Sequence, residues 1–305
     1  MDKIEETAVQ KRFRQLSHMA TFHRNKSPLS SSWVIVGIGF VTLALTYSTW
    51  YSFSVFFVAL LKEFSWSRST GAGAFSLFVI LHGLISPFVG GMVDRFGPKK
   101  IFIPGAILLG GGLILCSVIH SWWEFYIFFG FLAAIGVGSI GWVPNTTLIQ
   151  QWFKENRGLP MGIISSGVGI GILVCVPLIQ FLITRFGGRV AYAIMAFFIP
   201  LTIILLVLVF IKKPPAGDSS VYRINHPKEA LRKEEGTAQS WTIRQVIGTK
   251  QFQLLCLSFF FSSVSITSIL THHVAFFVDQ GLEALFASYI VGLLGLVSIG
   301  AKILW

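Results

Sequence analysis

The chain has 305 residues, of which 53% are hydrophobic and 12% are charged, and its mean hydropathy is +0.72. Soluble domains carry about 25% charged residues, so this composition excludes an ordinary water-soluble domain and favours a protein that lies in a bilayer. The net charge of +11 does not predict a nucleic-acid partner, because the basic residues lie between long apolar runs and form no basic face interleaved with aromatic side chains.

Eight apolar runs are long enough to cross a membrane, since a helical span needs roughly 20 apolar residues. In chain order they are 33–61, 70–92, 101–119, 122–149, 158–184, 190–211, 251–275 and 284–305. A polar tail, 1–32, precedes the first run, and a segment with charges of both signs, 212–250, separates the sixth from the seventh. We therefore predict an all-α membrane protein, with a six-helix bundle over 33–211, a linker over 212–250 and the first two helices of a second bundle over 251–305.

The last apolar run is still apolar at Trp305 and has no polar flank. We therefore expect the native chain to continue beyond this residue, with a second copy of the basic turn that follows the second run.

Lysine and arginine are distributed unequally between the two sides of the predicted bundle. The tail, 93–100, 150–157 and 212–250 together hold 19 of them, whereas the connections on the other side hold only 4. Because cytoplasmic loops carry the excess of basic residues, the N-terminus and the linker are expected in the cytoplasm. The predicted location is a bacterial inner membrane or a plasma membrane, crossed several times.

Motifs of soluble catalysis are absent from the sequence. The three cysteines lie inside apolar runs and form no CxxC pair, so we expect neither a disulfide framework nor a metal site. No GxxxxGK[ST] phosphate loop, HExxH helix or nucleophile elbow occurs. The sequence therefore predicts no enzyme and no cofactor.

A basic turn, GGMVDRFGPKK at 90–100, follows the second run. Gly90 allows close contact between helices, Asp94 can accept backbone hydrogen bonds or pair with a cation, and Gly97 allows a tight reversal. Arg95 and Lys99 lie where the anionic leaflet attracts basic residues.

This turn resembles the signature G-x-x-x-D-R-x-G-x-[RK] of the major facilitator superfamily. The resemblance implies the major facilitator fold, transport without ATP, and a gating role for Gly90, Asp94, Arg95, Gly97 and Lys99. The segment 152–171 further resembles the junction between the fourth and fifth spans of the monocarboxylate transporters and oxalate/formate antiporters. The matching residues are Trp152, Phe153, Arg157, Gly158, Leu159, Gly162, Gly167 and Gly171.

Polar side chains at membrane depth are costly and are therefore candidates for binding cargo. We select Tyr51 in the first span, His82 in the second and Asn145 in the fourth. Lys302 is the one permanent cation within a span, and with Ala301 it stands where the monocarboxylate transporters have Ala-Arg. In that family the arginine binds the substrate carboxylate, while the first-span lysine falls at the position of Tyr51. The alternative for Lys302 is a cation that reaches the cytoplasmic interface or takes part in gating.

We expect a secondary or facilitative transporter of a small organic anion, such as a monocarboxylate, that works by alternating access. One cation in an otherwise uncharged cavity favours an anion. The expected partners are this small substrate, a coupling proton or counter-anion, and the lipid bilayer. The alternatives are an exporter of neutral or drug-like solutes, and a membrane sensor that has this fold without transporting.

Overall fold

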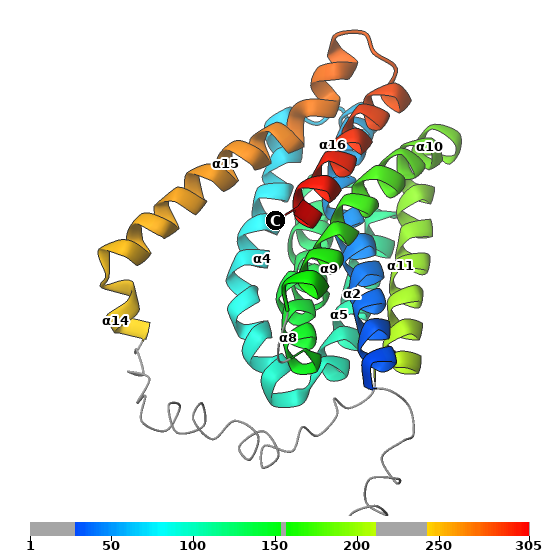
Figure 1. The fold of residues 1–305 in the computed structure, drawn as a ribbon. Helices are drawn as coiled ribbons and strands as arrows, with labels where there is room; N and C mark the ends of the chain where they lie inside the picture. The colour runs from blue at the N-terminus through cyan, green and yellow to red at the C-terminus, as the bar shows by residue number, and fades with distance from the viewer. Residues whose placement is uncertain (1–27, 154–156, 212–242, 305) are drawn as a thin grey trace, which may run out of the picture.

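The structure, a computed structural model, describes residues 28–153, 157–211 and 243–304. Eight helical segments there are long and apolar enough to cross a membrane. Their order and bounds agree with the eight predicted runs within a few residues (Figure 1). The predicted tail up to residue 27 and the linker from 212 to 242 lie outside the described residues.

The first span is divided, although its sequence is one continuous apolar run. Helix α2 (Pro28–Tyr51) ends where Ser52 interrupts the helix, and α3 (Phe53–Phe64) continues the same span. Ser65 then adopts a left-handed conformation with φ of 53°, which ends α3. The second span is the single helix α4 (Arg68–Phe96), whose Ser67 side chain accepts a hydrogen bond from the Thr70 backbone N–H and so caps the first turn.

The fourth and fifth spans contain π-helical turns that interrupt the regular ladder. The fourth consists of α6 (Trp122–Phe125), η1 (Tyr126–Ala133), α7 (Ala134–Ile140) and α8 (Trp142–Trp152). The fifth consists of α9 (Gly158–Ile170), η2 (Gly171–Cys175) and α10 (Val176–Phe186). Such turns are rare and often occur at functional sites.

Four of the remaining helices follow the predicted pattern, namely α5 (Pro98–Cys116), α11 (Gly188–Phe210), α15 (Lys250–Asp279) and α16 (Ala284–Leu304). The short helix α14 (Ile243–Ile247) lies in the segment predicted as the linker. The start of α2, the α4–α5 turn and the end of α11 lie at the same end of the bundle (Figure 1), which is the end predicted to be cytoplasmic.

Glycines allow the first six spans to pack closely. A Cβ added at Gly136 of α7 would lie 2.5 Å from the backbone nitrogen of Leu109 in α5. Stacked phenylalanines fill the interior beside these contacts, since Phe53 lies 4.4 Å from Phe75 and 5.3 Å from Phe129 between ring centroids. In a bilayer there is no hydrophobic driving force between helices, so close van der Waals packing through small residues holds them together.

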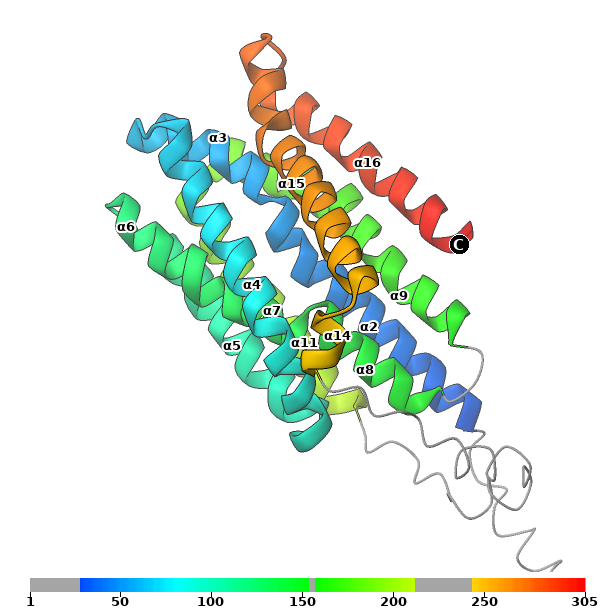
Figure 2. The same cartoon turned by 90° about the vertical axis from the view of Figure 1, so that its left-hand side faces the viewer.

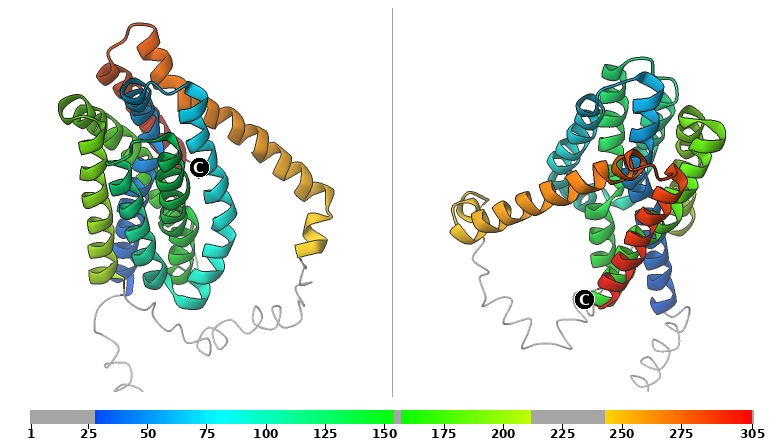
Figure 3. Two further views of the ribbon diagram at one scale, coloured as in Figure 1. Left: turned by 180° about the vertical axis from the view of Figure 1, so that it is seen from behind. Right: turned by 90° about the horizontal axis from the view of Figure 1, so that it is seen from above.

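The last two helices pack differently from each other. Helix α16 lies along α9 (Figure 2), where Gly169 and Gly295 face each other so closely that a Cβ on Gly169 would lie 2.6 Å from the Gly295 carbonyl oxygen. The first half of helix α15 projects away from the bundle (Figure 3), and its buried residues are confined to its second half, at Thr271, Val274 and Ala275.

Candidate functional site

The predicted gating turn is a sharp reversal between α4 and α5. Gly97 has φ of +82°, a left-handed value that glycine adopts without strain. A Cβ added at Gly90 would lie 3.3 Å from Val143 Cγ1, so this glycine brings α4 close to α8. Lys99 donates a hydrogen bond of 3.2 Å to the Leu208 carbonyl oxygen and thereby ties the turn to the end of α11.

The Asp94 carboxylate has no hydrogen bond or ion pair with any residue that the structure describes. It lines a cavity of about 830 Å³, together with Lys99, Lys100, Gln151 and apolar residues at the ends of α4 and α11. Arg95 points elsewhere, with its guanidinium 5.2 Å from the Phe96 ring centroid. The acidic and basic members of the turn are thus not paired with one another.

Lys302 reaches from α16 to α9. Its Nζ donates to the Ser165 carbonyl oxygen at 3.2 Å, and its own carbonyl oxygen lies 3.2 Å from the position of a Cβ on Gly162. The side chain is half-buried. Because an ammonium has three N–H donors and one hydrogen bond is recorded within the described residues, Lys302 keeps donors for a ligand.

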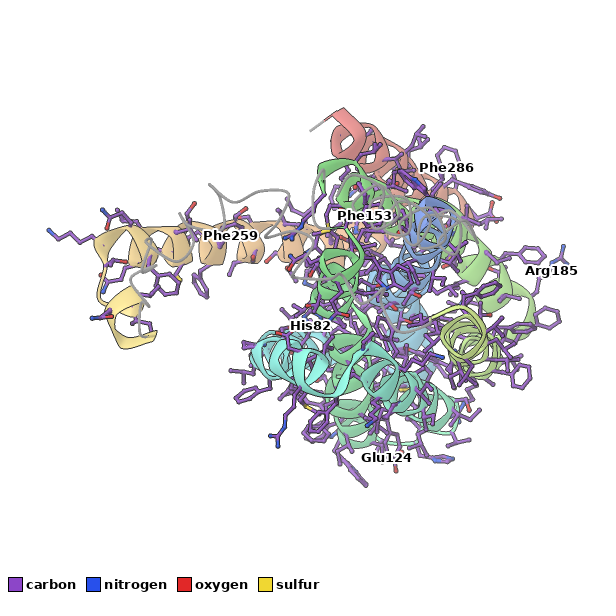
Figure 4. All side chains as sticks on the ribbon, turned by 60° about the horizontal axis from the view of Figure 1, so that its bottom comes forward. His82, Glu124, Phe153, Arg185, Phe259 and Phe286 are labelled. Carbon is purple, nitrogen blue, oxygen red and sulfur yellow. The ribbon has the colours of Figure 1, made fainter. Side chains whose placement is uncertain are left out.

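His82 lies on α4 (Figure 4), and its ring lies against that of Trp50 of α2. The two ring centroids are 5.1 Å apart in an edge-to-face arrangement. On the other side, a Cβ at Gly141 would lie 3.7 Å from both His82 Nε2 and the Tyr47 hydroxyl oxygen. The structure therefore brings His82 together with Tyr47 and Trp50, two further side chains of the first span.

Asn145 is fully buried at the break between α7 and α8. Its Nδ2 donates to the carbonyl oxygens of Ile140 and Gly141, at 2.8 and 2.7 Å. The Ile140 oxygen lacks the usual donor four residues on, because residue 144 is a proline, whereas the Gly141 oxygen also accepts from the Asn145 backbone N–H at 3.4 Å. Its Oδ1 has no hydrogen-bond partner among the residues that the structure describes, and it points towards Gly39, where an added Cβ would lie 3.4 Å away. Asn145 thus stabilises the bend on which Gly141 sits.

The four predicted cargo residues do not form one cluster. Tyr51 is half-buried at the end of α2, one turn beyond Tyr47, whereas His82 and Asn145 both lie close to Gly141. Lys302 lies apart from these three, on the face of α9 that carries Ser165.

An ion pair at the opposite end of the bundle was not anticipated. Arg68, at the start of α4, donates from Nη2 to Asp279 Oδ2, at the end of α15, over 2.5 Å. Beside it, the His272 ring lies edge-on to Phe57, with centroids 5.6 Å apart. The available sequence signal was an acidic residue and a basic residue on the same predicted side of the membrane.

Comparison with known proteins places this arrangement in a family. The sequence model described as the Major Facilitator Superfamily matches residues 39–305. The chain belongs to the Major Facilitator Superfamily. Membership and the eight candidate membrane helices confirm the predicted all-α membrane fold, and membership confirms the prediction that the chain is not an enzyme.

Several curated relatives are transporters by name. The chain is 27% identical over 168 residues to monocarboxylate transporter 13 of Rattus norvegicus, which covers 55% of this chain and 39% of the relative. It is 30% identical over 155 residues to monocarboxylate transporter 9 of Mus musculus, and the match covers 51% of this chain and 30% of that transporter. It is also 33% identical over 139 residues to the fujikurins efflux protein of Gibberella fujikuroi, and the match covers 46% of this chain and 29% of that protein. The match thus spans well under half the length of each of these relatives, and it confirms the resemblance to the monocarboxylate transporter group.

Proposed function

We propose that this chain belongs to a secondary transporter that moves a small organic anion, such as a monocarboxylate, by alternating access. In this proposal residues 33–211 form the first bundle, 212–250 is the cytoplasmic linker, and 251–305 begins the second bundle. The bound anion neutralises Lys302, and a proton or counter-anion couples its movement. The family membership and the names of the relatives support this reading.

The observation that carries the proposal is the position of Lys302. Its ammonium is the one permanent cation in the predicted spans, and it comes from the second bundle while contacting a carbonyl of the first. A carboxylate bound there contacts both halves, and transporters of this architecture bind substrate between their repeats. A ligand that interacts with both halves has a different affinity in each conformation, which is the requirement for shifting between them.

The other predicted residues take separate roles in this proposal. Tyr51 and His82 offer neutral polar groups to the cargo, and Asn145 holds the bend at Gly141 with its Oδ1 as a remaining acceptor. Gly90, Asp94, Arg95, Gly97 and Lys99 form the gate at the cytoplasmic end, where the Asp94 carboxylate has no partner among the described residues and is available to a cation in another conformation.

An uptake measurement tests the role of Lys302. The protein expressed from its complete reading frame is reconstituted in liposomes and given labelled pyruvate, lactate or oxalate. We expect Lys302→Gln to reduce uptake of the accepted anion by roughly 30-fold or more, since losing one partner of a buried charge pair costs about 2–5 kcal/mol. Lys302→Arg retains the charge and keeps most of the activity.

The matched control is Lys62→Gln, because Lys62 is an exposed cation at the outer end of α3. Uptake by Lys302→Gln at the parental rate would refute the carboxylate contact. Loss of uptake in Lys302→Arg with full activity in Lys302→Gln would assign the residue to gating instead.

An exporter of neutral or drug-like solutes is the second candidate. One relative is named as an efflux protein, and the residues around His82 are aromatic and uncharged. Equal uptake of an acid and of its neutral amide would favour this candidate over the anion transporter.

A further inference from the structure

The cavity of about 830 Å³ beside the α4–α5 turn is separate from the proposed cargo site, because none of the four predicted cargo residues lines it. It lies between this turn and the end of α11, at the end of the bundle that is predicted to be cytoplasmic (Figure 1). Sites for small molecules have volumes of roughly 300–1,000 Å³, so the space suits a small molecule or a lipid headgroup. We call it the turn cavity.

The charged side chains of the turn cavity come from one short stretch of the chain. Asp94 lies in the last turn of α4, and Lys99 and Lys100 lie in the first turn of α5. Asp94 and Lys100 have no hydrogen bond or ion pair with any residue that the structure describes, and Lys99 makes a single hydrogen bond, to the Leu208 carbonyl oxygen. Since an ammonium has three N–H donors, both lysines and the carboxylate can still bind a ligand.

Apolar side chains form the rest of the lining and continue onto the surface of the spanning helices. Phe96, Leu208 and Val209 line the turn cavity and are 45%, 53% and 59% exposed. Exposed apolar side chains on a spanning helix are typical of contact with acyl chains. A soluble ligand would leave this apolar surface uncovered, whereas a lipid covers it with its chains while its headgroup occupies the polar part.

We propose that the turn cavity binds a phospholipid of the cytoplasmic leaflet, and that the preferred headgroup is phosphoserine. This headgroup carries a phosphate, a carboxylate and an ammonium, so its charges are the complement of those of Lys99, Lys100 and Asp94. The two anionic groups pair with the lysines and the ammonium pairs with Asp94. Anionic lipids enrich the cytoplasmic leaflet, and basic pockets between spanning helices on that side bind anionic headgroups. The inference rests on the predicted orientation and not on the proposed cargo.

The other common headgroups match the lining less well. Phosphatidylglycerol has a phosphate but no cation, so it leaves the Asp94 carboxylate facing an anion. Phosphatidylethanolamine has an ammonium but only one anionic group, so it leaves one of the two lysines without a partner. The quaternary ammonium of phosphatidylcholine has no N–H group to donate to Asp94. These differences make the four lipids a matched set of probes.

Binding of short-chain lipids tests the proposal without any measurement of transport. The purified protein, expressed from its complete reading frame and held in an uncharged detergent, is titrated in a calorimeter with the dihexanoyl form of each lipid. We expect the Kd for phosphatidylserine to be about fivefold or more below the other three values, as one additional ion pair at a membrane surface permits. In Lys100→Gln the Kd for phosphatidylserine rises by roughly fivefold, and in Asp94→Asn the preference over phosphatidylglycerol disappears.

The matched control is Lys62→Gln, which removes an exposed cation at the opposite end of the bundle and should leave all four Kd values unchanged. Lys99→Gln replaces Lys100→Gln if the latter does not fold. Equal Kd values for the four lipids in the parent, tighter binding of phosphatidylglycerol than of phosphatidylserine, or an unchanged Kd in the lysine variant would overturn the proposal. Glycerophosphoserine has the same headgroup without acyl chains, and its binding as tightly as the lipid would also overturn it, in favour of a soluble organic phosphate.

Discussion

Three consecutive glycines in α5 allow a sharp test of the packing, because the same change has three different surroundings. A Cβ at Gly112 would lie 2.8 Å from the Phe128 carbonyl oxygen and 2.9 Å from the Ala133 backbone nitrogen. At Gly110 it would lie 2.7 Å from Pro200 Cγ, whereas at Gly111 the nearest atom is the flexible Leu132 Cδ2 at 4.0 Å. Backbone and proline atoms cannot move aside without displacing a helix.

The magnitude follows from this difference. Overpacking costs about 1–3 kcal/mol, a roughly 5- to 150-fold shift in the folding equilibrium. Replacing glycine by alanine also favours a helix by about 0.5–1 kcal/mol, but this gain is common to all three positions and cancels in the comparison. We therefore expect Gly110→Ala and Gly112→Ala to be less stable than Gly111→Ala by about 1–3 kcal/mol.

The assay is thermal unfolding of the purified protein in one detergent, followed by tryptophan fluorescence. Gly111→Ala should unfold at or above the parental temperature, and the other two variants below it. If Gly111→Ala is destabilised as strongly as Gly112→Ala, or if all three variants unfold at the same temperature, the assignment of the close helix contacts is wrong.

Two further predictions concern the ends of the bundle. Arg68→Asp should weaken the contact between α4 and α15, by no more than about 1 kcal/mol because the ion pair is exposed, and Asp279→Arg added to it should restore the contact. Thermal unfolding of the parent, the single variant and the double variant measures the effect, and equal unfolding temperatures in parent and single variant would refute the role of the ion pair. For topology, a cysteine introduced at Ser219 in the predicted cytoplasmic linker should react with a membrane-impermeant maleimide only after the cells are opened, and labelling of intact cells would reverse the proposed orientation.

Much of the fold was accessible from the sequence because membrane spans are specified locally. Each helix must satisfy its own backbone hydrogen bonds in lipid, so a long apolar run is sufficient to identify it, and all eight predicted runs are helices. The turn at Gly97 was also predictable, since a glycine after an Asp-Arg pair and before a proline indicates a reversal. Neither result depends on which helices are neighbours.

Only the tertiary structure decided which side chains meet. Lys302 contacts Ser165 across 137 residues and Arg68 pairs with Asp279 across 211, and no local pattern encodes such distances. Of the glycines at 110–112, identical in sequence, two face another helix closely and one does not. Hydropathy identifies each span from its own segment of the sequence. A binding site instead depends on the rotation and depth of several helices, and these are fixed by the packing of small residues between the helices.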